Sequence, residues 1–176
     1  MSVRRWIVAG AVVVAVTAGG LTYHGRSAVT SSATCSHSGY SRAKFGNQPS
    51  PVVRKRIIAR DGLVDAYTGT AQPAGWSPDA DHVVPLSWAW DHGACRWTAL
   101  RRIRFASDLD PSGAPTAVPH ELVLTSAHLN RQKGDKPPSQ WLPPVDPCRY
   151  VGVFLAIADA WDLTVPTSER RAVLTC

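Results

Sequence analysis

Four widely spaced cysteines place the strongest constraint on how this chain of 176 residues can fold. Cys35, Cys95, Cys148 and Cys176 include no Cys-x-x-Cys pair and lack zinc-finger spacing, which argues against a structural zinc site. An even number of cysteines in an exported chain is typical of disulfide bonds. Two bonds can be arranged in three ways. We favour Cys148–Cys176, which would tie the last helical segments together, and then Cys35–Cys95 by elimination.

The N-terminal residues indicate that the chain is exported. Arg4 and Arg5 precede an uncharged run from Trp6 to Tyr23 that is rich in Val and Ala. A positively charged start followed by an apolar stretch is typical of a signal peptide, and the run also lies near the lower length limit of a membrane-spanning helix. We therefore interpret residues 1–23 as a signal peptide or an N-terminal membrane anchor. The prediction is a secreted or extracytoplasmic protein.

The composition indicates a folded, basic domain. Hydrophobic residues make up 44% of the chain and charged residues 18%, which argues against a disordered polyampholyte. The 19 Lys and Arg residues exceed the 13 Asp and Glu residues, for a net charge of +6. A basic surface attracts polyanions such as nucleic acid or anionic lipid without indicating which one. We infer no protein partner, and membrane contact only through the N-terminal anchor.

The chain is predicted to enter one domain through a linker and to form short elements within it. Residues 24–50 are rich in Ser and Gly, which predicts a linker that enters the domain and is pinned at Cys35, and residues 51–176 form the domain. Ser126 or Thr125 can cap a helix that Gly134 ends, and Pro147 favours the first turn of another. The expected elements are a basic helix or strand over 52–60, strands over 63–67 and 80–86, helices over 86–93 and 96–108, a strand over 121–124, and helices over 127–133, 147–161 and 168–174.

Two segments carry candidate chemistry. The first is the run DHVVPL at residues 81–86, at the end of a predicted strand, and the second is NRQKGD at residues 130–135, on a predicted helix and its end. A carboxylate at a strand end and an amide on a helix can share one cation when a β-hairpin packs on that helix. Adjacent strand residues point to opposite faces, so Asp81 can face a metal while His82 faces a water. Taken singly, Asp81 can instead cap a turn, and His82 can be a hydrogen-bonded structural histidine.

These two segments, followed by WLPP at residues 141–144 and CRYV at residues 148–151, resemble the HNH endonuclease family. The similarity is greatest to the exported branch of that family and covers residues 38–176. The resemblance implies an α+β fold with a ββα-metal core, known as the His-Me finger, to which additional helices and disulfide bonds are added. It also implies a metal-dependent endonuclease that hydrolyses phosphodiester bonds, with DNA as the expected nucleic acid.

The resemblance implies a role for each candidate residue. His82 matches the general base that deprotonates the attacking water, a role that suits the ordinary pKa of imidazole. Asp81 and Asn130 match the ligands of one divalent metal ion, which is Mg²⁺ or Mn²⁺ by the oxygen ligands, with Zn²⁺ as the alternative. Contacts with phosphate are expected from a set of basic residues: Arg131, Lys133, Arg101, Arg102 and Arg104.

Glu121 departs from the pattern of the family, which usually has an asparagine on the second strand to orient the base histidine. A carboxylate at this position can accept the second N–H of His82 and raise its basicity, and it can equally repel phosphate. Glu121 is therefore a second candidate catalytic residue. It also supports the alternative prediction, a catalytically impaired module of the same fold that binds nucleic acid or another polyanion. The motifs H-E-x-x-H and G-x-S-x-G are absent, so nothing supports a peptidase or serine hydrolase.

Overall fold

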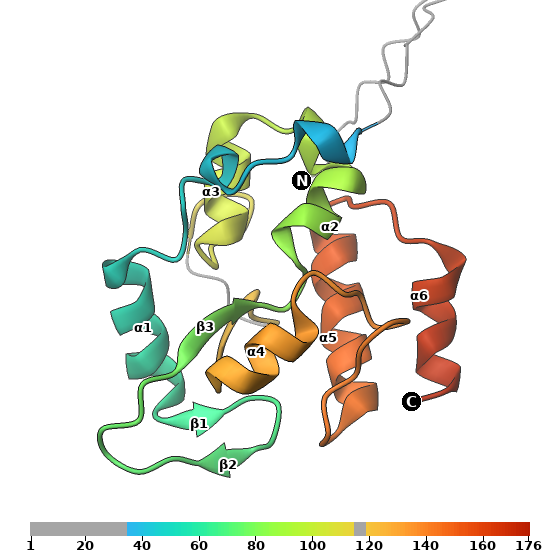
Figure 1. The fold of residues 1–176 in the computed structure, drawn as a ribbon. Helices are drawn as coiled ribbons and strands as arrows, with labels where there is room; N and C mark the ends of the chain where they lie inside the picture. The colour runs from blue at the N-terminus through green and yellow to red at the C-terminus, as the bar shows by residue number, and fades with distance from the viewer. Residues whose placement is uncertain (1–34, 115–118) are drawn as a thin grey trace, which may run out of the picture. The chain divides into compact units, whose positions relative to one another are not determined.

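The computed structural model describes residues 35–114 and 119–176 (Figure 1). The predicted signal peptide or anchor, residues 1–23, and the first part of the predicted linker lie outside these ranges. Within the described residues, no helix combines the length and the apolar character needed to cross a membrane.

The described chain forms short helices and short strands. In chain order they are the 3-10 helices η1 (His37–Gly39) and η2 (Arg42–Phe45), α1 (Pro51–Asp61), β1 (Val64–Asp65), β2 (Thr70–Ala71), β3 (Asp79–His82), α2 (Leu86–Asp91), the 3-10 helix η3 (Ala94–Arg96), α3 (Ala99–Ala106), β4 (Leu122–Thr125), α4 (Ala127–Lys133), α5 (Pro147–Ala160), α6 (Thr167–Arg171) and the 3-10 helix η4 (Ala172–Leu174).

The strands form two small antiparallel pairs. β1 pairs with β2, and β3 pairs with β4 in a register that places Asp79 opposite Thr125 and His82 opposite Leu122. The elements α2, η3 and α3 lie between β3 and β4 in the sequence. The backbone N–H of Ala66 donates to the carbonyl of Leu124 and so joins the β1–β2 hairpin to β4. Mixed helices and small sheets confirm the predicted α+β class.

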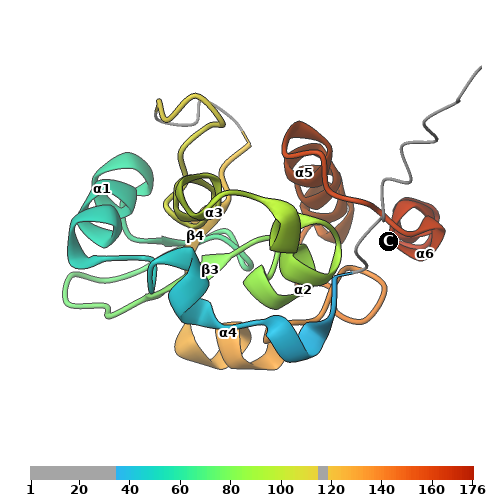
Figure 2. The same cartoon turned by 90° about the horizontal axis from the view of Figure 1, so that it is seen from above.

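The two faces of the β3–β4 pair are covered by different helices (Figure 2). One face forms a small apolar core with α1, built from a set of aliphatic side chains: Val53, Ile57, Ala80, Leu122 and Leu124. Helix α4 packs against β3 on the other side. A larger core rich in aromatic residues joins α2, α3 and α5, with Phe105 and Phe154 fully buried. The β3–β4 pair therefore lies between two layers and has almost no exposed surface.

Several local predictions are confirmed. Helix α4 spans the predicted residues, because the Ser126 hydroxyl accepts a hydrogen bond from the N–H of Leu129 and the chain leaves the helix at Gly134. The basic segment 52–60 is a helix, which Ser50 caps and Pro51 begins. Both favoured disulfide bonds are present, with Cα atoms 5.7 Å apart for Cys35–Cys95 and 5.1 Å apart for Cys148–Cys176.

The second part of the predicted linker and domain entry, residues 35–50, is packed on the domain. Phe45, at the end of η2, is completely buried in the large core. The indole N–H of Trp90 donates to the carbonyl of Ser36, and Cys35 is bonded to Cys95. Small polar residues dominate this segment, but one aromatic side chain and one disulfide bond are enough to hold it on the domain. The folded part therefore includes residues 35–50.

Candidate functional site

Strand β3 directs its side chains alternately to the two faces of the β3–β4 pair. Asp79 and Asp81 point toward α4, where each contacts a side chain of that helix. His82 points to the opposite face, where its ring contacts the backbone at the end of α3. This separation of Asp81 and His82 follows from the two-residue period of a strand.

Both oxygens of the Asp81 carboxylate are occupied by buried partners. The Tyr67 hydroxyl donates to Oδ2 at 2.5 Å, and the Lys133 ammonium lies 2.9 Å from Oδ2 and 3.2 Å from Oδ1. Lys133 also donates to the carbonyl of His82 at 2.7 Å, and its side chain is 0% exposed. A buried charge is tolerated when it is paired and hydrogen-bonded. This ion pair therefore fixes the C-terminal end of α4 on β3.

Burial also changes the proton affinity of the tyrosine in this network. Desolvation raises the pKa of the Tyr67 phenol well above its usual value, and the neighbouring Asp81 carboxylate raises that pKa further. Tyr67 therefore remains a hydrogen-bond donor at any physiological pH. The Asp81 carboxylate has a neutral donor on one side and a cation on the other.

Asn130 contacts a different carboxylate from the one predicted. Its amide Nδ2 donates to Oδ2 of Asp79 at 2.9 Å. Asn130 and Lys133 are three residues apart and share one face of α4, so they reach two strand residues that also share a face. The predicted pairing of Asp81 with Asn130 is thus replaced by two pairs, Asp79 with Asn130 and Asp81 with Lys133.

The ring of His82 is buried and held in one tautomer. Its Nε2 lies 3.0 Å from the carbonyl oxygen of Ala106. A carbonyl only accepts hydrogen bonds, so Nε2 carries the proton and Nδ1 keeps its lone pair. Burial lowers the pKa of His82 to about 3, and the charges of Arg42 and Lys133 act in the same direction, whereas the bond to Ala106 opposes them. The imidazole is therefore neutral at physiological pH.

Glu121 does not orient His82 in this structure, which corrects the expectation from the sequence. Its Oε2 accepts the N–H of Val84 at 3.2 Å, and its Oε1 is buried without a hydrogen-bond partner among the described residues. The reason is the strand register: Leu122 pairs with His82, so the preceding residue points to the opposite face. Desolvation raises the pKa of Glu121 well above its usual value, which favours the neutral acid.

The three arginines predicted to contact phosphate from α3 are engaged within the protein. Arg101 donates to the carbonyl of Trp161 and to the Asp162 carboxylate. Arg102 donates to the carbonyls of Lys44 and Trp97, and Arg104 donates to the carbonyl of Pro111. These contacts hold α3 in place, and phosphate binding by the three arginines stays a prediction.

The two predicted phosphate contacts on α4 have different outcomes. Lys133 is fully buried in its ion pair with Asp81, so its ammonium does not reach the surface in this structure. Arg131 is exposed on the same helix. Of these two side chains, only that of Arg131 is open to solvent, and its phosphate contact stays a prediction.

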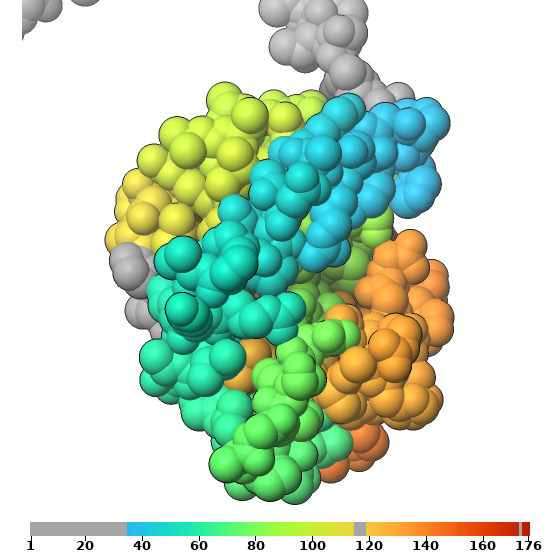
Figure 3. Space-filling model, turned by 60° about the vertical axis from the view of Figure 1, so that its left-hand side comes forward, coloured from blue at the N-terminus to red at the C-terminus, as the bar shows by residue number. Residues whose placement is uncertain are grey.

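Two groups of residues near the site were missed by the sequence prediction. One is Asp79, which the period-two pattern Asp-x-Asp on a strand would have placed beside Asp81. The other is the basic surface of η2 and α1, where Arg42 lies close enough to lower the pKa of His82 and Lys55 is exposed. Figure 3 shows the segments that contain η2, α1 and α4 on one face of the molecule. The segment 52–60 was identified as basic, but its sequence alone did not indicate that it lies near β3 and α4.

Within the two described ranges, no group of three or more His, Cys, Asp or Glu side chains is placed to hold a metal ion. The predicted ligands Asp81 and Asn130 do not fit a shared cation, because the ammonium of Lys133 already lies against the Asp81 carboxylate. Asp79 and Asn130 fit better, since both are partly exposed and both carry an oxygen that hard divalent cations accept.

Comparison with known proteins gives one informative relative. No protein-family model and no solved structure matches the chain. An uncharacterized secreted protein of Arthroderma benhamiae is 32% identical over 156 residues, which cover 77% of this chain and 72% of the relative. The secretion of that relative and the two disulfide bonds support an extracellular location for this chain. The chain belongs to the same family as this secreted protein of Arthroderma benhamiae.

Proposed function

We propose that this protein is a secreted endonuclease of the HNH type, which hydrolyses phosphodiester bonds of nucleic acid, with DNA as the expected substrate. The observation that carries the proposal is the arrangement of β3, β4 and α4. An Asp-His pair ends the first strand, the second strand pairs with it, and the following helix rests on the first strand through Asn130. This is the order of elements and residues that the resemblance to a ββα core implies.

His82 is the proposed general base. Its Nε2–H is fixed on Ala106, so the lone pair on Nδ1 is the position that accepts a proton from water. Its lowered pKa keeps this nitrogen unprotonated at physiological pH and also makes it a weaker base than an ordinary imidazole. The tautomer is held by a backbone carbonyl, so in this proposal His82 does not depend on Glu121.

A divalent cation would supply electrophilic stabilisation of the phosphate oxygens and of the leaving group. Asp79 and Asn130, which lie on the face of β3 opposite to the His82 ring, are the residues proposed to hold it. The exposed basic side chains around this face, Arg42, Lys55 and Arg131, are proposed to contact the phosphates on either side.

A nuclease assay with matched histidine variants tests the proposal. The wild-type protein should nick plasmid DNA with Mg²⁺ or Mn²⁺, and EDTA should stop the reaction. His82→Asn should lower the rate by about 100-fold or more, because a general base contributes on the order of 10²–10⁴. His128→Asn is the matched control, since His128 is exposed on α4, and it should keep full activity.

Two results would contradict this proposal. One is cleavage that persists in EDTA, and the other is wild-type activity in a folded His82→Asn protein. Circular dichroism and a thermal unfolding curve for each variant separate a loss of chemistry from a loss of fold. Asp79→Asn provides an independent variant at the partly exposed surface and should raise the metal concentration needed for half-maximal activity.

One observation favours a second candidate function, a nucleic-acid-binding module without catalysis. The Asp81 carboxylate, which the resemblance assigns to the metal, is held by Lys133 and Tyr67. Such a module would bind DNA with an affinity that falls steeply with salt and would cleave it with none of the metals. Binding measured at two or more salt concentrations, alongside the cleavage assay, distinguishes the two functions.

A further inference from the structure

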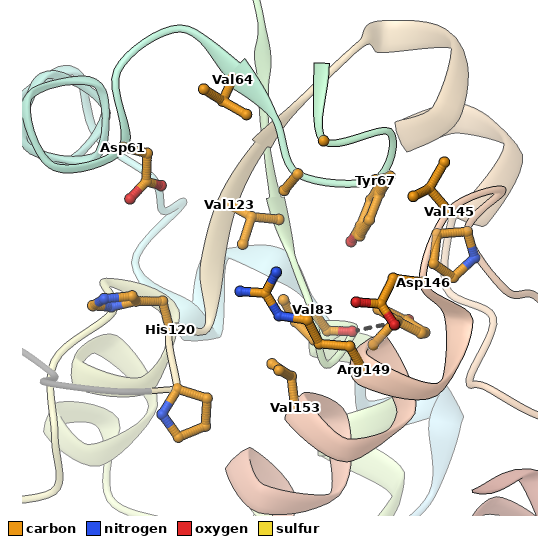
Figure 4. Close-up of a pocket in the computed structure, with 15 residues that line it drawn as sticks. Asp61, Val64, Tyr67, Val83, His120, Val123, Val145, Asp146, Arg149 and Val153 are labelled. Atoms are coloured by element: carbon orange, nitrogen blue, oxygen red, sulfur yellow. Dashed lines mark hydrogen bonds between the residues drawn. The ribbon is translucent and has the colours of Figure 1, made fainter. Parts of the chain in front are cut away.

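An apolar cavity of about 630 Å³ opens beside the β1–β2 hairpin, between β4 and the start of α5 (Figure 4). Valine side chains from four separate segments form its walls: Val64, Val83, Val123 and Val153. Tyr67 and Tyr150 also line it and are almost completely buried. Its volume is within the ~300–1,000 Å³ of small-molecule sites, which are also lined mainly by apolar residues.

The mouth of this cavity leaves apolar surface in contact with water. Val145 is 50% exposed and Val64 is 37% exposed, and both lie among the lining residues. Apolar surface in a concave site is stabilised when a ligand covers it. The cavity therefore favours a ligand with an apolar body.

One cation enters the cavity without an internal partner. Arg149, on the first turn of α5, lies amid the valine side chains in Figure 4, and no hydrogen bond or ion pair within the described residues engages it. Two other titratable residues of the lining do have partners. The Asp61 carboxylate lies 2.5 Å from the guanidinium of Arg60, and His120 Nδ1 lies 3.3 Å from the Asp108 carboxylate. Asp146 is exposed at the same rim. Arg149 is thus the cation available to an anionic group inside the mouth.

We propose that this cavity binds a small amphiphilic carboxylate. The apolar body would lie along the valines, and the carboxylate would accept paired hydrogen bonds from the guanidinium of Arg149. A nucleobase is a poorer fit, because the two tyrosines among the lining residues are almost completely buried. The tyrosine hydroxyls are also engaged: Tyr67 donates to Asp81, and Tyr150 donates to the carbonyl of Val83 at 3.4 Å. This inference does not depend on the proposed nuclease activity.

Calorimetric titration of the exported, disulfide-bonded protein with decanoate and decanol tests the proposal. Decanoate should bind one saturable site, and decanol, which has the same chain without the charge, should bind at least tenfold more weakly. Arg149→Gln should lower the affinity for decanoate about tenfold and leave the affinity for decanol unchanged. Arg171→Gln is the matched control, because Arg171 is exposed on α6 away from the lining residues, and it should bind like the wild type.

A second variant tests the position of the ligand. Val145→Glu adds a negative charge at the mouth, at a half-exposed position where the fold should tolerate it. This change should weaken the binding of decanoate more than the binding of decanol. Absence of saturable decanoate binding would overturn the proposal, and so would an Arg149→Gln protein with undiminished affinity. Displacement of decanoate by a short oligonucleotide would assign the cavity to nucleic acid instead.

Discussion

The ammonium of Lys133 lies in the interior with the Asp81 carboxylate as its counter-ion. Replacing Lys133 with methionine would keep much of the side-chain volume but would leave the Asp81 charge buried and unpaired. We expect the free energy of unfolding to fall by about 3–5 kcal/mol, the range found when one member of a buried pair is removed. Urea unfolding measures this loss.

Arg131→Met on the same helix is the control for Lys133→Met. Arg131 is exposed, so this change should alter the free energy of unfolding by less than about 0.5 kcal/mol. Equal stabilities of the two variants would show that the ion pair contributes nothing. A triple exchange in which Asp81, Lys133 and Tyr67 all become apolar would then be expected to fold as well as the wild type.

The buried imidazole of His82 makes the free energy of unfolding depend on pH in the acidic range. The pKa is about 3 in the folded protein and close to 6.5 in the unfolded chain. Both states are neutral above the unfolded pKa, so His82 adds no pH dependence there. As the pH falls from the unfolded pKa toward the folded one, only the unfolded chain takes up a proton. Stability should therefore fall by about 1.4 kcal/mol per pH unit in that window.

Glu121 acts in the opposite direction and must be separated from His82. Its raised pKa lets the folded state keep a proton, so its contribution is present at low pH and is lost as the pH rises above its unfolded value. Urea unfolding of wild type and His82→Asn at several pH values isolates the imidazole, because Glu121 is common to both. Parallel pH profiles for the two proteins would contradict the assigned pKa of His82.

The residues of the site were predicted from the sequence better than their contacts were. The sequence identified Asp81, His82, Asn130 and Lys133 as a group, and the structure brings their segments together on β3 and α4. It did not predict which carboxylate meets which helical side chain. The pairing depends on the position of α4 along β3, because a shift of α4 by one turn would place Asn130 beside Asp81 instead of Asp79. The spacing of these residues in the sequence is the same for both arrangements.

Helix α4 depends on Ser126, the capping residue just before it, for the position of the Asn130 and Lys133 side chains. The Ser126 hydroxyl accepts the N–H of Leu129 at 3.3 Å. Ser126→Ala should lower the free energy of unfolding by about 1 kcal/mol, because one N–H of the first turn loses its acceptor. Ser126→Asp, which retains an acceptor, is the control and should restore most of the stability. Thermal unfolding of the three proteins checks this, and a fully stable alanine variant would contradict it.

Element boundaries were predictable where the chain carries its own start and stop signals. Ser126 and Gly134 delimit α4, and Pro147 begins α5, as expected from the sequence. The elements without such signals were missed or misjudged. The 3-10 helix η2 was read as part of a linker because its anchoring depends on Phe45 meeting a core built from distant segments. Long-range packing of this kind leaves no periodic pattern in the sequence.

At the scale of the whole molecule, two disulfide bonds fasten the chain near opposite ends of the described residues. They join residues separated by 60 positions for Cys35–Cys95 and by 28 positions for Cys148–Cys176. In the chain-entropy model, loops of these lengths stabilise the fold by about 4 and about 3.5 kcal/mol. Paired Cys→Ala variants of each bond should therefore be destabilised, with Cys35→Ala/Cys95→Ala affected slightly more.

Urea unfolding of the two paired variants, with and without a thiol reductant, checks this expectation. Reductant should lower the midpoint of the wild type and of both variants, because each variant retains the other bond. An unchanged wild-type midpoint under reducing conditions would contradict a stabilising role for these bonds. A single Cys→Ala change is a poorer test, because it leaves a free thiol that can react.

The separation of β3 from β4 along the chain has a consequence for newly made protein. β4 is synthesised only after α2, η3 and α3, which lie between the two strands, so β3 cannot pair with it earlier. The Asp81–Lys133 contact likewise joins residues 52 positions apart. Contacts of this range form slowly, and a solitary strand offers free backbone groups to any neighbouring copy. Charges on such a strand oppose pairing between chains. We therefore expect the charges of Asp79 and Asp81 to reduce aggregation of the chain before the fold is complete.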